Sequence, residues 1–191
     1  MIHISVEGMD GAGKSTICEL LAKKLNYVFV EKPLHFLLDD NNEISRYREI
    51  AKRVNSNPNR NFTAMFYGLG SIYMYEMFKD KNIITDRHLA SNYAWSGTDY
   101  NSDIYDLIIK KIGTPKITVI LYATHDVIVK RLKMRNKEDN NIAKANMSET
   151  IYAKMIAFCK LHNFFYKVID TSYLTPDAIV NQIMKELGYK S

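Results

Sequence analysis

The sequence has little of what marks a secreted, zinc-stabilised or membrane-embedded protein. Its 191 residues include two cysteines, Cys18 and Cys159, which lie far apart and outside any CxxC pair. This excludes a zinc site built from cysteine pairs and a disulfide framework, and it favours a reducing compartment. No positively charged leader precedes the first apolar residues, and no apolar run approaches the roughly 20 residues that span a bilayer. We therefore expect a cytoplasmic protein that is neither secreted nor membrane-embedded.

Concentrated charge of one sign is absent as well. The 26 lysines and arginines outnumber the 21 acidic residues, but they are scattered along the chain and do not alternate with aromatic residues in a basic stripe. Proteins that bind single-stranded nucleic acid combine such basic grooves with stacking aromatics. We therefore expect no nucleic-acid partner. The net charge of +5 by itself would favour any polyanion, whether a nucleoside triphosphate, a nucleic acid or an anionic membrane, and it is too modest to choose among them.

Short apolar runs alternate with longer helical patterns along the chain. Five runs rich in β-branched and aromatic residues have the length of strands, at residues 2–6, 27–30, 82–85, 117–122 and 164–169. Helical periodicity appears at residues 15–25, 62–78, 125–135, 147–162 and 175–187, and a further helix is expected at 43–54. Alternating strands and helices predict a mostly parallel sheet. We expect one α/β domain over residues 1–191, in a doubly wound, three-layer arrangement.

One glycine-rich motif lies between the first strand and the first helix. It matches the pattern G-x-x-x-x-G-K-[ST] and consists of Gly8, Met9, Asp10, Gly11, Ala12, Gly13, Lys14, Ser15 and Thr16. Glycines let successive backbone N–H groups face one phosphate chain, and the following helix adds its positive end. We predict that Lys14 reaches the β- and γ-phosphates of ATP and that the Ser15 hydroxyl ligates Mg²⁺. Thr16 is either a second hydroxyl near the phosphates or an early helix residue.

A phosphate-binding loop alone does not separate kinases from GTPases or motor ATPases. Residues 136–139 have the order of a guanine-reading motif, but they extend a charged helical stretch and do not follow a strand. The third strand run ends in Asp86 and Arg87, without the Asp-Glu pair of a motor ATPase. We predict that Asp86 holds the metal shell and that Arg87 binds a phosphoryl oxygen through its planar fork. A surface ion pair is the alternative.

Basic residues gather after the fourth strand run. Arg131 and Arg135 are four residues apart and share one face of the predicted helix. Such a segment is typical of a lid that closes over ATP, excludes water and neutralises the transferred phosphoryl group. We predict a lid around residues 131–145 in which both arginines are catalytic, with a solvated basic helix end as the alternative.

These motifs together resemble the thymidylate kinase family of P-loop nucleoside monophosphate kinases over nearly the whole chain. The likeness rests on residues 6–16, on 85–88 with 95–97, on the lid, and on 169–172. It implies a P-loop kinase fold with a mostly parallel five-stranded sheet flanked by helices. It also implies ATP and Mg²⁺ at the glycine-rich loop, an acceptor nucleotide on the opposite side, and a homodimer.

The resemblance also implies roles for single residues. Asp10 faces the acceptor sugar or the surroundings of its phosphate, and Lys32 matches the basic residue that holds the acceptor phosphate. Arg87 bridges the two phosphate chains, and Thr171 lies at the strand end where the adenine of ATP packs. A turn residue is the alternative for Asp10.

The sequence departs from the family pattern at the acceptor base. In thymidylate kinases a stacking phenylalanine is followed four residues later by an arginine that reads the thymine carbonyl, whereas residues 64–71 contain no arginine. Phe66 or Tyr67 can still stack on a base, although an aromatic residue at helical spacing is more often part of a core. Asn92 is a further candidate for the acceptor pocket.

A second, weaker likeness connects the chain to deoxynucleoside kinases. Glu31, Lys32 and Pro33 resemble the glutamate-proline step after the second strand of those enzymes, and their lid is similar. Glu31 would then act as general base for a 5′-hydroxyl, whereas a monophosphate already presents an anionic oxygen. We expect ATP-dependent transfer to a nucleoside monophosphate, dTMP or a related one. A deoxynucleoside kinase is the near alternative, and a non-catalytic nucleotide-binding regulatory protein is the distant one.

Overall fold

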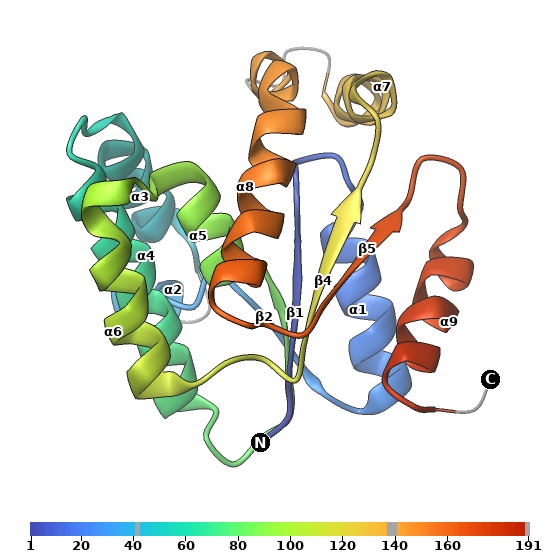
Figure 1. The fold of residues 1–191 in the computed structure, drawn as a ribbon, viewed down its shortest axis with the longest axis horizontal. Helices are drawn as coiled ribbons and strands as arrows, with labels where there is room; N and C mark the ends of the chain where they lie inside the picture. Colours follow the sequence, from blue (N-terminus) through green and yellow to red (C-terminus); the bar gives the residue numbers. More distant parts are fainter. Residues whose placement is uncertain (41–42, 137–140, 190–191) are drawn as a thin grey trace.

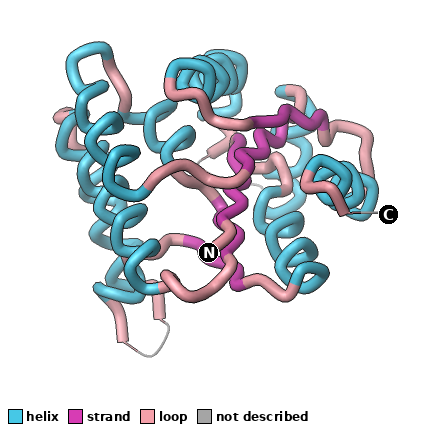
Figure 2. Tube along the Cα trace, turned by 60° about the horizontal axis from the view of Figure 1, so that its bottom comes forward, coloured by secondary structure: helices cyan, strands magenta, loops and turns pink. Residues whose placement is uncertain are grey.

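The computed structural model describes residues 1–40, 43–136 and 141–189, and its centre is a five-stranded sheet. The strands lie in the order β2-β3-β1-β4-β5, and all four neighbouring pairs are parallel. Figure 2 shows them as one twisted layer between helices. The strands are β1 (His3–Gly8), β2 (Val28–Glu31), β3 (Ile83–Asp86), β4 (Ile117–Tyr122) and β5 (Tyr166–Asp170).

Helices connect the strands and cover both faces of the sheet. Two of them begin with local side-chain caps: Asn59 accepts backbone N–H groups at the start of α4, and Thr175 does so at the start of α9. The helices are α1 (Lys14–Leu25), α2 (His35–Leu38), α3 (Ser45–Ser56), α4 (Arg60–Met77), α5 (Leu89–Ser96), α6 (Ser102–Ile112), α7 (His125–Arg135), α8 (Ser148–Leu161) and α9 (Pro176–Glu186). Short 3₁₀ turns are η1 (Asp99–Asn101) and η2 (Ala143–Met147).

The two faces of the sheet carry separate apolar cores. Ile4 and Val6 of β1 point to the face that packs against α1 and α9. The opposite face meets α4, α5, α6 and α8, whose core includes Tyr105 and Phe158. Figure 1 shows the two groups of helices on opposite sides of the sheet. The result is the predicted three-layer α/β architecture, with the sheet as its middle layer.

The strand order places a ligand site beyond the carboxyl end of β1. Strands β2 and β3 lie on one side of β1, while β4 and β5 lie on the other, so the connections change direction at β1. In parallel α/β sheets, ligands bind in the crevice outside the carboxyl ends of the strands at such a switch point. The ends of β1, β2 and β3 therefore contribute to one site.

The structure confirms the predicted strands and parallel sheet, with shifts of one or two residues at most ends. The helix expected at 43–54 is present as α3. Helices α2, α5 and α6 were not predicted from the sequence. Within the described part of the chain, no helix combines the length and the apolar character needed to cross a membrane.

Candidate active site

The glycine-rich loop requires its glycines because of its backbone conformation. Gly8, Gly11 and Gly13 have φ angles of 140°, 86° and 94°, which residues with a Cβ rarely adopt. A Cβ on Gly8 would lie 2.5 Å from the carbonyl oxygen of Leu121 in β4. The loop turns back through a hydrogen bond from the Ala12 N–H to the Met9 carbonyl, 3.2 Å long. It leads directly into the N-terminus of α1, as predicted for a phosphate-binding loop.

Lys14 and Ser15, the first residues of α1, both face Asp86 at the end of β3. Lys14 is buried, its Nζ donates to the Met9 carbonyl at 3.1 Å, and Asp86 Oδ1 is 3.7 Å away. The Ser15 hydroxyl donates to Asp86 Oδ2 at 2.7 Å. Burial lowers the pKa of Lys14, and the Arg87 charge adds to this, while Asp86 and Asp10 oppose it.

These oxygen atoms suit a magnesium ion. Mg²⁺ prefers hard oxygen ligands and is usually held by one or two protein groups together with water and substrate phosphates. Ser15 and Asp86 present a hydroxyl and a carboxylate side by side. The described residues contain no cluster of three or more His, Cys, Asp and Glu side chains that could enclose a metal alone. The donor set therefore fits a metal that is shared with bound phosphates.

Arg87 connects β3 to the glycine-rich loop. Its φ angle of 76° lies in the left-handed region, and its N–H donates to the Val6 carbonyl at 2.9 Å. Its Nη2 donates to Asp10 Oδ1 at 2.8 Å. Burial alone would raise the pKa of Asp10, but Arg87 and Lys14 outweigh it and lower that pKa to about 2. Asp10 is therefore ionised at neutral pH.

Arg131 ties α7 to the opposite side of the loop. Its Nη1 donates to the Gly11 carbonyl at 3.3 Å and to Thr171 Oγ1 at 3.1 Å, and its Nη2 donates to the Thr171 carbonyl at 2.6 Å. The Thr171 hydroxyl also lies 3.2 Å from the Ala12 carbonyl. A Cβ on Gly11 would meet Leu132 at 3.2 Å, so α7 packs directly on the loop. Loop, α7 and the end of β5 thus form one hydrogen-bonded unit.

The polar residues around the loop line one cavity of about 760 Å³. Among the described residues that line it, six side chains are cationic and three are carboxylates, an excess of positive charge that favours a polyanion such as two phosphate chains. These described lining residues are Asp10, Gly11, Gly13, Lys14, Ser15, Thr16, Glu31, Lys32, Arg48, Asp86, Arg87, Arg131, Leu132, Arg135 and Asn141.

The β2 side of the cavity holds Glu31, Lys32 and Arg48. Glu31 and Lys32 form an ion pair with each other. Burial lowers the pKa of Lys32, while the charge of Asp86 opposes that shift. Arg48 comes from α3 and was not predicted from the sequence as a site residue. Its helix was expected, but nothing in the spacing of its arginines distinguishes Arg48 from Arg46 or Arg53.

Three predicted acceptor residues are not part of this lining. Phe66 is half-buried against the cluster of Leu34, Tyr47 and Ala51. The Tyr67 hydroxyl donates to Asn55 at 2.7 Å. The amide of the buried Asn92 donates to the Ala64 carbonyl at 3.0 Å and accepts from the Tyr105 hydroxyl at 3.3 Å. Their contact with substrate stays a prediction.

The predicted lid is only partly covered by the structure. Residues 137–140, which include most of the guanine-reading pattern at 136–139, lie outside the described residues. On the near side, α7 carries Arg131 and Arg135 to the cavity, and on the far side η2 leads into α8. Closure of residues 131–145 over ATP stays a prediction.

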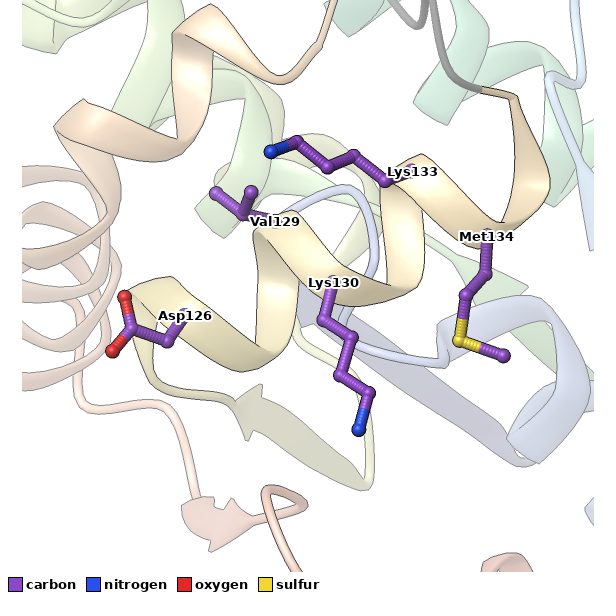
Figure 3. A pocket seen from close by; sticks show the side chains of 5 residues that line it. All are labelled: Asp126, Val129, Lys130, Lys133 and Met134. Carbon is purple, nitrogen blue, oxygen red and sulfur yellow. The ribbon is translucent and has the colours of Figure 1, made fainter.

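A second hollow, of about 830 Å³, lies on the outer surface of α7. Figure 3 shows its lining side chains, which all project from the same helix: Asp126, Val129, Lys130, Lys133 and Met134. Within the described part of the chain, no second element contributes a group to this lining, in contrast to the cavity at the glycine-rich loop.

The fold and the convergence of cations on a glycine-rich loop are those of the P-loop kinases, enzymes that transfer a phosphoryl group between nucleotides. Within that class, the chain belongs to the thymidylate kinase family, whose model matches residues 6–183. It is a nucleotide kinase, as the sequence resemblance predicted. The family membership also supports a small nucleotide as its substrate.

Similarity to individual proteins agrees with this assignment. The chain is 26% identical to a probable thymidylate kinase of Methanocaldococcus jannaschii, over 98% of this chain and 95% of that protein. It is 23% identical to a thymidylate kinase of Mycoplasma mobile, over 98% and 92% of the two chains.

Solved structures share the fold at low identity. A deoxyadenosine kinase from M. mycoides with dCMP and a flexible dCDP bound superimposes with a TM-score of 0.67 at 20% identity, covering 98% of this chain and 99% of that one. Thymidylate kinase from Candida albicans superimposes with a TM-score of 0.72 at 16% identity, over 98% and 91% of the chains. At these identities the likeness bears on the fold and not on the acceptor.

Proposed function

We propose that this nucleotide kinase transfers the γ-phosphoryl group of ATP to the 5′-phosphate of a deoxynucleoside monophosphate, dTMP or a related one. The observation that carries the proposal is the distribution of charge along the cavity. Lys14, Arg131 and Arg135 lie on the side of the glycine-rich loop and α7. Lys32 and Arg48 lie on the β2 side, and Arg87 follows β3, the strand between β2 and β1. Two groups of cations suit a donor and an acceptor that both carry phosphates.

Different residues of the cavity are expected to bind the donor, the metal and the acceptor. Phosphoryl transfer depends on alignment of the reactants and on neutralising charge on the transferred group, because its transition state is loose. The loop N–H groups and Lys14 bind the donor phosphates, while Ser15 and Asp86 would hold a Mg²⁺ ion, which supplies further positive charge. Lys32 and Arg48 hold the acceptor phosphate, whose anionic oxygen needs no general base.

Arg87 is the residue that both substrates share. Its guanidinium is held by Asp10 at 2.8 Å, at the junction of the loop and the end of β3. Arg135 faces the same cavity from α7. We propose that residues 131–145 close as a lid and add their positive charge to the transferred group as water is excluded.

A deoxynucleoside kinase is the second candidate because Glu31 lines the cavity beside Lys32. A neutral 5′-hydroxyl must lose a proton as it attacks, and a carboxylate within reach can accept it. The same ion pair makes the two candidates separable, since one needs the cation and the other the carboxylate.

The deciding experiment is an ATP-dependent ADP-release assay on a panel of deoxynucleosides and their monophosphates. We expect stimulation by monophosphates. Lys32→Met should then raise the acceptor KM about tenfold or more, while Glu31→Gln should leave kcat within a few-fold. Stimulation by deoxynucleosides only, with a large loss of kcat in Glu31→Gln, would establish the second candidate. Stimulation by neither class would indicate a non-catalytic regulatory protein.

The buried cysteines and an exposed apolar stripe bear on the compartment and the oligomeric state of the enzyme. We propose a cytoplasmic homodimer, with both cysteines buried and reduced. Four exposed apolar residues spaced three or four apart form a stripe along α4, which suits packing against a second copy: Phe62, Met65, Leu69 and Ile72. Light scattering measures the mass of the parent protein and of Leu69→Asp. We expect a dimeric parent and a monomeric variant, and a monomeric parent would contradict the proposal.

A further inference from the structure

The central strand β1 carries a fully buried carboxylate. Glu7 has an exposed fraction of 0%, and it shares its face of the strand with His3 and Ser5, while Ile4 and Val6 point to the other face. Strands buried on both faces are ordinarily apolar, and a buried charge without partners is costly. Burial raises the pKa of Glu7, while hydrogen bonds from Ser91 and His88 and the Arg87 charge oppose that rise. The hydrogen-bond partners of Glu7 therefore decide whether its buried carboxylate is stabilised.

The partners of Glu7 all belong to the start of α5. Its Oε2 accepts the backbone N–H of His88 and that of Ser91, each at 3.2 Å, and the Ser91 hydroxyl at 2.5 Å. The first N–H groups of a helix have no partner within the helix and are usually satisfied by a nearby capping side chain. Here the preceding residue, His88, provides no side-chain cap. Glu7 takes that role from 81 positions earlier in the chain.

This distant cap lies beside an unusual turn. Arg87, immediately before His88, is in the left-handed conformation that residues with a Cβ seldom occupy, and such residues persist only where their surroundings hold them. Its N–H is bound by the Val6 carbonyl and the next N–H by Glu7, so two successive residues of β1 fix the turn. The Arg87 Nη1 donates to Ser91 Oγ at 3.4 Å, the same hydroxyl that donates to Glu7.

We propose that Glu7 is a positioning residue, which holds the first turn of α5 and thereby fixes the guanidinium of Arg87 between the two phosphate chains. The carboxylate itself is buried beneath the site and is not part of the cavity lining. Its effect on the reaction passes through Ser91 and Arg87. The inference rests on the proposed function, in which Arg87 contacts both substrates.

Single variants give the first test, measured as KM and kcat for the acceptor and for ATP. Glu7→Ala should raise the acceptor KM and lower kcat, together reducing kcat/KM by about tenfold to a hundredfold, because Arg87 loses its fixed position. The KM for ATP should rise less than the acceptor KM, since Lys14 and the loop N–H groups still bind the donor phosphates. Glu7→Gln keeps an acceptor oxygen for the same three donors, so it should restore most of the activity.

Ser5→Ala is the matched control. Ser5 is also buried, lies on the same face of β1, and donates to Thr118 Oγ1 of β4 at 2.9 Å. Its bond connects strands and not α5. We expect its acceptor KM to be that of the parent protein, and a rise equal to that of Glu7→Ala would overturn the proposal, because any buried polar residue of β1 would then have the same effect.

A double-mutant cycle with Arg87→Ala gives the decisive test. If Glu7 acts through Arg87, the double variant should lose about as much kcat/KM as Arg87→Ala alone; independent losses that multiply would overturn the proposal. Should circular dichroism show that Glu7→Ala does not fold, Ser91→Ala replaces it in the same cycle with the same two outcomes. A parent protein that turns over no acceptor would contradict the proposed function. An active parent protein in which the kcat/KM losses of the two single variants multiply in the double variant would contradict this inference alone.

Discussion

The two halves of the cavity, which we propose bind the phosphate donor and the acceptor, are built differently. On the donor side, Lys14 has an exposed fraction of 6%, and Lys14 and Arg131 donate to backbone carbonyls of the loop and of Thr171, the residue after β5. On the acceptor side, Lys32 and Glu31 are 38% and 33% exposed and pair with each other. Bonds to the backbone fix Lys14 and Arg131 to the fold, whereas Lys32 and Glu31 pair with each other's side chains. The fold therefore fixes the side chains of the proposed donor site more firmly than those of the proposed acceptor site.

The acceptor base illustrates this difference. Gly70 lies at the position where the resemblance leads one to expect an arginine, four residues after Phe66. A Cβ at Gly70 would lie 3.2 Å from Leu34 and 3.4 Å from Pro33, so the segment after β2 occupies the adjoining space. Base recognition in this chain must then rest on other groups, while the donor half keeps the whole loop pattern.

Loss of the loop lysine should have the largest effect. Lys14→Ala removes a buried charge that acts on the transferred phosphoryl group, a contribution of about 3 to 5 kcal/mol, so turnover should fall by two to four orders of magnitude. Steady-state kcat measures this, with circular dichroism as the check on folding. Lys24→Ala, on the exposed end of the same helix, is the control. A folded Lys14→Ala with near-normal kcat contradicts the donor assignment.

The lid arginines should affect chemistry more than ATP binding. Arg135→Ala should lower kcat about a hundredfold with little change in the KM for ATP, because its charge matters mainly as the phosphoryl group leaves. Lys130→Ala serves as the control, because this exposed lysine of α7 precedes the lid (Figure 3). If Arg135→Ala instead changes only the KM for ATP, α7 is a binding surface.

Base selectivity should be modest. Without an arginine to read the carbonyl, stacking alone tolerates different bases. We predict that dTMP is favoured over every other monophosphate by less than about a hundredfold in kcat/KM, or roughly 2.7 kcal/mol. The measurement compares dTMP, dUMP, dCMP, dGMP and dAMP in one buffer. Sharp selectivity for dTMP would mean that another residue replaces the arginine.

Acid should lower the stability of the fold through two buried histidines, His3 and His88. Burial lowers the pKa of His88, next to Arg87, to about 3 from 6.5, and burial and the neighbouring His88 lower the pKa of His3 well below that value. At a pH between the lowered pKa values of the folded chain and 6.5, the unfolded chain binds protons that the folded chain does not. The free energy of unfolding therefore decreases as the pH falls below about 6.5. From pH 7 to 5, His88 alone should cost about 2 kcal/mol.

Urea unfolding at the two pH values measures this loss of stability. His88→Phe should lose clearly less stability on acidification than the parent protein, because one of the two buried histidines no longer titrates. An equal loss in both proteins would show that acid sensitivity arises elsewhere.

The same contrast explains what the sequence could predict. The loop, the strands and the helices with strong periodicity are encoded in contiguous residues, so Lys14, Ser15 and the parallel sheet could be predicted and were found in place. Helix α5 could not be, because it is short and its cap, Glu7, comes from a distant strand. Arg48 likewise enters the cavity only through the packing of α3, which local spacing does not specify.

Product analysis tests the central claim most directly. The parent protein is incubated with γ-labelled ATP and an equimolar mixture of a deoxynucleoside and its monophosphate, and the labelled products are separated. We predict that the label enters the deoxynucleoside diphosphate, because Lys32, Arg48 and Arg87 favour an acceptor that already carries a phosphate. Label found only in the monophosphate would contradict the account and identify the 5′-hydroxyl as the acceptor.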